Sequence, residues 1–169
     1  MKNDCVKEKI IEALRLFISR DKQQLLEVDI YEPTLSHRIA VYLEDLFPEH
    51  DVDCEYNKNL SDPKKDINGK RIRPDIIIHK RKKSDNNSVI IEVKKNGKDS
   101  KLARADVIKL KGCIQGSLNY NIGVFIGILK RRVDICWIEK SNNHISETFE
   151  ILPLDSVDIV LNSSCDSAI

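Results

Sequence analysis

The sequence predicts a single α/β domain in which a mixed central β-sheet is flanked by helices. The first observation is the order of the apolar patterns along the chain, which is helix, strand, strand, strand, helix, strand, strand. The second is the length, because 169 residues suffice for one domain with a real core and are few for two. The third is the composition of 41% hydrophobic and 33% charged residues, an ordinary globular balance.

We divide the chain into a helical extension at residues 1–30, a core at residues 31–140, and an edge strand with a frayed tail at residues 141–169. In the extension, apolar residues between Asp4 and Arg20 follow a helical period with charged residues opposite them. Asp21 is a candidate cap for a short second helix. Two roles stay open, because these helices could cover a face of the sheet or mediate dimerisation.

The core begins with a helix over residues 34–47, which follows Glu32 and Pro33 and ends before Pro48. Proline suits the first turn of a helix and cannot continue one. Residues 51–57 then alternate polar and apolar side chains, which predicts a strand with one buried face. A long polar loop follows.

The central feature of the core is a predicted β-hairpin over residues 73–80 and 88–95, joined by a polar turn. Asp75 lies near the start of its first strand, and Glu92 and Lys94 lie at the end of its second. Because side chains alternate along a strand, Glu92 and Lys94 share one face. Pairing of the strands would bring two carboxylates and one ammonium group together, which can make a divalent-cation site with a basic residue beside it.

The remaining pattern predicts a helix, two strands and an edge strand. The helix covers about residues 100–117. Residues 122–129 form an unbroken apolar run, typical of a strand that is covered on both faces. Residues 133–139 predict the next strand, and residues 146–152 add one at the edge.

The charge of the chain is nearly balanced, with 28 basic and 27 acidic residues, and says nothing for or against nucleic acid. Its distribution is more informative, because basic residues outnumber acidic ones between Lys58 and Lys83. Such a run forms either a solvated loop or, beside a metal site, a rim that attracts phosphate. The basic residues of this run include Lys64, Lys65, Lys70, Arg71, Arg73, Lys80, Arg81 and Lys82.

The cysteines and the hydropathy of the sequence predict the cellular compartment of the protein. The five cysteines are scattered and contain no C-x-x-C pair, so we expect neither a zinc site nor a disulfide framework. The sequence shows no signal-peptide pattern and no apolar run of transmembrane length. We therefore expect a protein of the reducing cytoplasm that does not contact a membrane.

The hairpin also carries a family resemblance. Its Pro74-Asp75 and Glu92-Val93-Lys94, with the order of elements around them, resemble the PD-(D/E)xK nuclease superfamily. That superfamily includes restriction endonucleases, archaeal Holliday-junction resolvases and nucleases of DNA repair and phage defence. The resemblance covers residues 32–138 and implies a restriction-endonuclease-like α-β-β-β-α-β core. The runs S-H-R-I-A-V-Y-L-E and V-D-C-E-Y-N also look like those of an uncharacterised bacterial group within it.

The resemblance implies a metal-dependent hydrolysis of phosphodiester bonds. Asp75 and Glu92 would hold Mg²⁺, which Mn²⁺ could replace, with the backbone carbonyl of Val93 as a third ligand. Lys94 would point at the attacking water. Because a free lysine titrates near about 10.4, Lys94 has either a lowered pKa or the role of a cation that orients hydroxide and steadies charge.

The superfamily often adds a glutamate from the preceding helix to the catalytic residues. Our candidate is Glu32, and Glu44 and Glu55 are the alternatives. Glu32 could instead only stabilise the helix dipole. On the later helix, relatives place polar residues near the site, which makes Asp106 and Lys109 further candidates.

The candidate contacts to nucleic acid are basic residues around this site, and for His37 and Arg38 the alternative is a helix-surface or helix–sheet packing role. These candidates are His37, Arg38, Arg73, Lys95 and Lys109. Tyr56, Tyr120 and Trp137 could stack on bases, but core packing is the favoured reading for single aromatic residues in such positions.

The sequence thus predicts a Mg²⁺-dependent nuclease acting on DNA, without sequence specificity because no base-reading motif is present. The alternative is a catalytically silent nuclease-fold module that binds nucleic acid or a protein partner. A third reading is a partner or inhibitor protein that docks through its N-terminal helix. The sequence leaves open whether the protein forms a homodimer.

Overall fold

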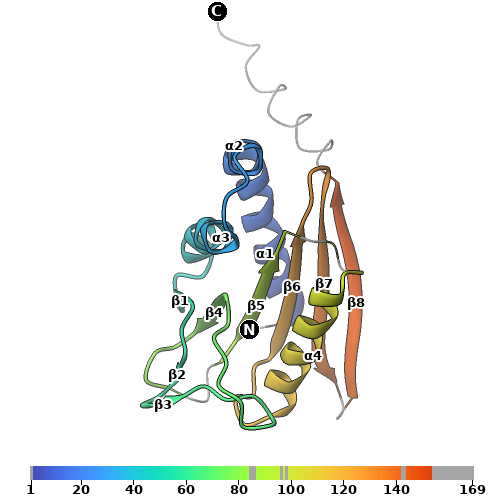
Figure 1. Cartoon of the computed structure of the whole chain (residues 1–169). Coiled ribbons are helices and arrows are strands. Elements are labelled where there is room, and N and C mark those ends of the chain that lie inside the picture. The colour runs from blue at the N-terminus through green and yellow to red at the C-terminus, as the bar shows by residue number, and fades with distance from the viewer. Residues whose placement is uncertain (1, 84–86, 96, 98, 142–143, 154–169) are drawn as a thin grey trace, which may run out of the picture.

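A computed structural model describes residues 2–83, 87–95, 97, 99–141 and 144–153, and its centre is a six-stranded sheet (Figure 1). The strand order is β1-β4-β5-β6-β7-β8, in which β5 and β6 are parallel and the other neighbours antiparallel. These strands are β1 (Asp51–Cys54), β4 (Ile76–His79), β5 (Val89–Lys94), β6 (Ile122–Ile128), β7 (Arg132–Ser141) and β8 (His144–Pro153). The predicted single α/β fold with a mixed sheet is confirmed.

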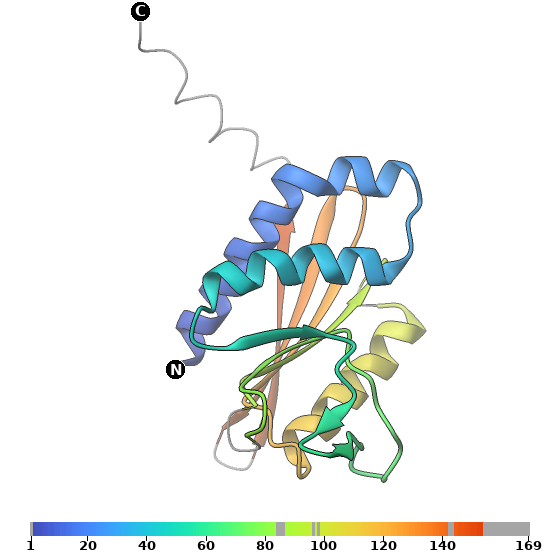
Figure 2. The same ribbon diagram turned by 90° about the vertical axis from the view of Figure 1, so that its left-hand side faces the viewer.

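Helices cover both faces of this sheet (Figure 2). Helices α1 and α3 lie over one face and α4 lies over the other. The helices are α1 (Asn3–Phe17), α2 (Gln23–Glu27), α3 (Glu32–Leu46) and α4 (Lys101–Gln115), and a π-helical turn at Ile18–Lys22 joins α1 to α2. None of these helices is both long enough and apolar enough to cross a membrane.

Two hydrophobic clusters sit on the two faces of the sheet. Along β5, Ile91 and Val93 pack into the cluster beneath α1 and α3, and Ile90 packs into the cluster beneath α4. This is the alternation that a pleated strand imposes. Strand β6 is buried at all 7 positions, which confirms the prediction of a strand covered on both faces.

Helix α1 belongs to the first of these clusters. Its inner residues Ile10, Leu14 and Phe17 are fully buried with the inner residues of α3. Of the two roles left open by the sequence, the structure shows the first, because α1 covers the sheet. The apolar face that a docking helix would offer to a partner is buried in the core.

The predicted elements are found with small shifts of their ends. The predicted strand over residues 51–57 ends at Cys54, because Glu55 turns the chain with a left-handed φ of 51°. A short hairpin of β2 (Lys58–Asn59) and β3 (Asp62–Pro63) occupies part of the predicted loop. The predicted edge strand is β8. The predicted tail beyond residue 153 lies outside the described residues.

Candidate active site

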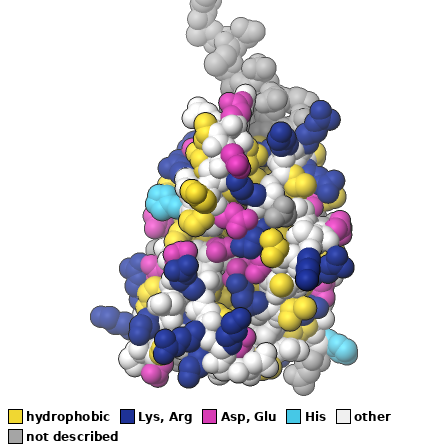
Figure 3. Space-filling model, in the orientation of Figure 1, with side chains coloured by type: hydrophobic (Ala, Val, Ile, Leu, Met, Phe, Trp, Pro, Cys, Tyr) yellow, Lys and Arg dark blue, Asp and Glu magenta, His cyan; other side chains and the backbone are white. Residues whose placement is uncertain are grey.

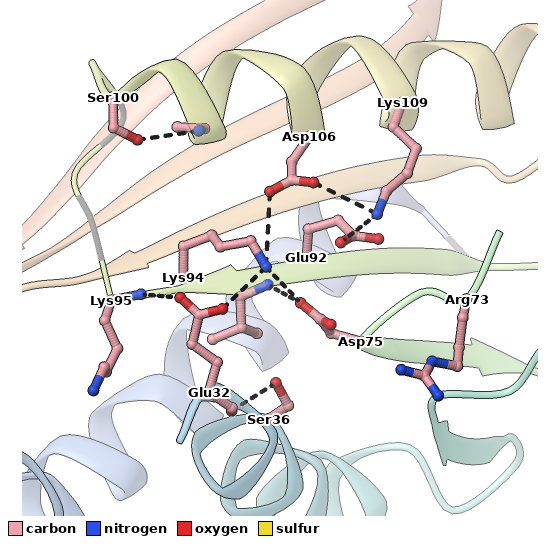
Figure 4. Close-up of polar contacts among 12 residues, drawn as sticks. Glu32, Ser36, Arg73, Asp75, Glu92, Lys94, Lys95, Ser100, Asp106 and Lys109 are labelled. Atoms are coloured by element: carbon pink, nitrogen blue, oxygen red, sulfur yellow. Dashed lines mark hydrogen bonds and ion pairs between the residues drawn. The ribbon is translucent and has the colours of Figure 1, made fainter. Parts of the chain in front are cut away.

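Acidic side chains gather on the molecular face between α3 and α4, with lysine and arginine side chains around them (Figure 3). Four carboxylates and two lysines from four parts of the chain meet in this cluster (Figure 4). The cluster comprises Glu32 of α3, Asp75 before β4, Glu92 and Lys94 of β5, and Asp106 and Lys109 of α4. With all six groups ionised, its formal charge is −2, from four negative and two positive groups.

The hairpin register explains why Asp75 and Glu92 are neighbours. Strand β4 pairs antiparallel with β5 so that Ile76 faces Ile91, and the next position of each strand brings Asp75 opposite Glu92. The Asp75 carboxylate then accepts a hydrogen bond of 2.7 Å from the backbone N–H of Val93. The sequence prediction that these two carboxylates meet at one end of the sheet is therefore confirmed.

Lys94 is surrounded by carboxylates. Its ammonium nitrogen lies 3.2 Å from Glu32, 3.8 Å from Asp75 and 3.9 Å from Asp106. Burial alone would lower the pKa of Lys94, but the carboxylates of Asp75, Asp106 and Glu32 outweigh it and raise the pKa above its ordinary value. Of the two roles left open for Lys94, this environment favours the cation.

Glu92 is the most enclosed carboxylate of the cluster, with a side chain only 2% exposed. One oxygen, Oε2, lies 2.6 Å from the ammonium group of Lys109, and the other, Oε1, has no hydrogen-bond partner among the described residues. Burial raises the pKa of Glu92 to about 8, and burial also raises the pKa of Asp75. A buried oxygen without a partner is costly, so Oε1 is a position where a proton or a cation would be stabilising.

The fit of this cluster to a metal ion is partial. Carboxylate oxygens are the ligands that Mg²⁺ prefers, and Glu92 Oε1 is free to serve as one. Within the described part of the chain, however, no three His, Cys, Asp or Glu side chains are grouped closely enough to hold a metal as they stand. Mg²⁺ needs only one or two protein carboxylates and keeps several waters, which matches the pair Asp75 and Glu92.

Among the three candidate glutamates, Glu32 is the one at the site. It begins α3, and its carboxylate accepts a 3.1 Å hydrogen bond from the backbone N–H of Lys95 besides its contact with Lys94. Glu44 is exposed farther along α3. Glu55 instead pairs with Arg73 at 3.4 Å. Sequence spacing could not separate the three, because the choice depends on how α3 packs across the sheet.

The side chain of Asp106 joins the two lysines of the cluster. Its oxygens lie 3.9 Å from the Lys94 nitrogen and 3.5 Å from the Lys109 nitrogen. The sequence indicated only that Asp106 and Lys109 lie on a helix near the site. The i, i+3 spacing of the two residues on α4 was the available signal, since it puts them on one face.

Of the remaining basic candidates, Lys95 and Arg73 are neighbours of cluster residues in the sequence. Lys95 lies beside the site, where its ammonium group donates to the carbonyl of Ile30 at 2.7 Å and to the carboxylate of Asp29. Arg73 is exposed on the segment that leads to Asp75.

Arg38 and His37 are not part of the cluster. The Arg38 guanidinium donates to Asp21 at 3.0 Å and to the Tyr42 hydroxyl, which ties α3 to the π-helical turn. This is the helix-packing role that was the alternative for Arg38. His37 is exposed on α3. Tyr120 and Trp137 are 2% and 3% exposed, in agreement with the favoured core-packing reading.

Comparisons with known proteins add no identification. A scan against protein-family models finds no match to this chain, and searches of curated proteins and of solved structures find none either.

Proposed function

We propose that this protein is a divalent-cation-dependent nuclease with DNA as its favoured substrate. The observation that carries the proposal is the meeting of Asp75, Glu92 and Lys94 at one end of the sheet, with Glu32 beside them. Hydrolysis of a phosphodiester needs an activated water and neutralisation of charge on phosphate, which carboxylates, a cation and a lysine together can supply. The order α3-β1-β4-β5-α4-β6 supports a restriction-endonuclease-like core.

In this proposal Asp75 and Glu92 hold Mg²⁺, or Mn²⁺ in its place, and the backbone carbonyl of Val93 is a third ligand. The ion would lower the pKa of a bound water and neutralise the charge of the scissile phosphate. Glu92 suits the role because one of its buried oxygens has no protein partner. Asp106 and Lys109 act as positioning residues, since Lys109 holds the other oxygen of Glu92 at 2.6 Å.

Lys94 acts as a cation in this proposal. The carboxylates around it raise its pKa, so it stays protonated at neutral pH and is a poor general base. A fixed ammonium group next to the reacting phosphate orients the attacking water and stabilises the charge that develops in the transition state. Glu32 fixes the direction of Lys94 through their 3.2 Å contact.

The second candidate is the catalytically silent module. The observation in its favour is that Lys94 and Lys109 pair with all four carboxylates and offset part of their charge, so the cluster is held together without any metal. In that case the cluster would be structural, and the basic side chains around it would bind nucleic acid with strong salt dependence and no metal requirement.

One experiment separates the two candidates. Purified protein is incubated with plasmid, single-stranded and branched DNA in Mg²⁺, Mn²⁺ or EDTA, beside the variant Asp75→Asn and the matched control Asp45→Asn, an exposed residue of α3. The nuclease proposal expects metal-dependent cleavage that Asp75→Asn abolishes and Asp45→Asn retains. Absence of cleavage on every substrate, together with no binding of Mn²⁺ by calorimetry, would favour the silent module.

A further inference from the structure

A second polar feature lies beside the cluster, in the region of the β2-β3 hairpin. It is a pocket of about 240 Å³ between this hairpin and the segment that leads to Asp75. Four of its lining residues are basic and none is acidic. These basic residues are Lys58, Lys64, Arg71 and Arg73.

Lys64 is the unusual member of the pocket, because it is a lysine with only 1% exposure. Its ammonium group donates to the backbone carbonyl of Lys58 and lies 4.8 Å from the centre of the Tyr56 ring. Burial lowers the pKa of Lys64 to about 8. The fold holds this residue in place, since its backbone N–H donates to Asn57 at 2.7 Å and its carbonyl accepts from Ile72 at 3.0 Å.

The positive charge of the pocket is mostly uncompensated. Within the described residues, Arg73 is the single basic lining residue that pairs with a carboxylate, Glu55, and that pair is loose at 3.4 Å and exposed. By contrast, Lys94 of the cluster pairs with three carboxylates and Lys109 with two. A buried cation is costly without a counter-charge, so the pocket is suited to an anion that enters from solution.

The pocket is joined to the cluster by a short piece of chain. Arg73 lines the pocket, and Asp75 of the cluster follows two residues later (Figure 4). In an extended chain this separation is about 7 Å. Lysine and arginine side chains also crowd the part of the surface over β2 and β3, next to the acidic centre (Figure 3). A polyanion lying across this face would contact both features.

We infer that this pocket is a subsite for a phosphate group of the nucleic-acid strand, next to the phosphate that is cleaved. Arginine binds phosphate through its planar fork and lysine through a point charge, and the pocket offers both. The inference rests on the proposed function. The inference adds a second position at which a phosphate of the strand is held, and this position would align the strand with the cleavage site.

The test uses Arg71→Gln, with Lys70→Gln as its matched control. Both residues are exposed and adjacent, and both changes remove one positive charge, but only Arg71 lines the pocket. Binding of a fluorescent oligonucleotide is measured by anisotropy in EDTA over a range of salt, so that no cleavage is required. We expect Arg71→Gln to weaken binding about tenfold and to lower the salt slope by about 1, with a much smaller effect of Lys70→Gln.

Two further arms identify the source of the phosphate. Oligonucleotides with and without a terminal phosphate are compared, and an Arg71→Gln effect on either of them supports the inference and tells a terminal from an internal phosphate. Inorganic phosphate is titrated while the melting temperature is followed. If it stabilises the unmodified protein but not Arg71→Gln, while oligonucleotide binding is equal in both, the pocket binds free phosphate and the inference is wrong.

A buried variant extends the test. Lys64→Met removes the enclosed ammonium group and should weaken oligonucleotide binding at least as much as Arg71→Gln, provided that circular dichroism shows a folded protein. Equal binding by Arg71→Gln and Lys70→Gln would overturn the inference. Failure of the proposed nuclease activity can be told apart from failure of this inference. In that case the protein would bind oligonucleotides through the pocket but would not cleave them when a metal is present.

Discussion

Lys109 and Glu92 are paired across the interface between α4 and β5, with 2.6 Å between the lysine nitrogen and Oε2 of the carboxylate. Oε1 of the same carboxylate is buried and has no hydrogen-bond partner among the described residues. The site therefore holds a carboxylate that is compensated on one side only. A buried oxygen without a partner costs stability in the absence of a ligand, so Glu92 links the site to the stability of the fold.

The pH dependence of stability follows from Glu92. Its pKa is raised from 4.5 to about 8 in the folded protein, so over this range the folded state binds more protons than the unfolded state. Its contribution is then fully present below pH 4.5 and is lost as the pH rises toward 8. We expect the free energy of unfolding to fall by a few kcal/mol over this window and Glu92→Gln to flatten the decline.

The measurement is urea denaturation in EDTA between pH 5 and pH 8. The matched control is Glu147→Gln. Glu147 is likewise a carboxylate of the sheet that pairs with a lysine of α4, Lys111, but its side chain is about one-third exposed. The control should keep the slope of the unmodified protein. An unchanged slope in Glu92→Gln would contradict the burial argument.

Removal of the Lys94 ammonium group should separate metal affinity from catalysis. Lys94→Met removes the ammonium group that competes with a metal among Asp75, Asp106 and Glu32, so we expect Mn²⁺ to bind about tenfold more tightly. Cleavage should nevertheless fall by about 10² or more, because the charge that develops on phosphate loses its ammonium partner. Calorimetry and a cleavage assay measure the two effects, and Lys111→Met is the control away from the site. Weaker metal binding by Lys94→Met would contradict this prediction and would indicate that Lys94 supports the structure of the site.

Glu32 offers a test of positioning against helix stabilisation. Glu32→Gln replaces the carboxylate that holds Lys94 and the backbone N–H of Lys95 with a neutral amide. We expect cleavage to fall about 10- to 100-fold. The melting temperature should change little, since an acid at a helix N-terminus typically contributes about 0.3–1 kcal/mol. Glu44→Gln on the same helix is the control. A loss of stability with full activity would reduce Glu32 to a helix-dipole role.

Arg38 should be dispensable for nucleic-acid binding. Because its guanidinium is bound to Asp21 and Tyr42, Arg38→Gln should lower the melting temperature and leave oligonucleotide affinity unchanged. Arg73→Gln is the contrasting variant and should lower the salt slope of binding by about 1. Fluorescence anisotropy and thermal unfolding distinguish them. A loss of affinity in Arg38→Gln equal to that in Arg73→Gln would return Arg38 to the binding surface.

Local patterns were sufficient for the fold class and for half of the site. Runs of β-branched residues joined by a polar turn predicted the hairpin, and the alternation of side chains placed Glu92 and Lys94 on one face. Hairpin pairing then made Asp75 and Glu92 neighbours. These relationships depend on residues close in sequence, where backbone geometry leaves few choices. The early end of β1 was missed, because the left-handed Glu55 leaves no sign in an apolar pattern.

By itself, the sequence determined the mixed α/β architecture and the carboxylates and lysine at the end of the hairpin. Only the tertiary structure decided that Glu32 reaches Lys94, that Asp106 and Lys109 join the cluster, and that Lys64 is buried. The physical reason is that these contacts arise between elements far apart in the chain. They depend on the packing of α3 and α4 against the sheet and of the β2-β3 loop against the segment before Asp75, which no local periodicity specifies.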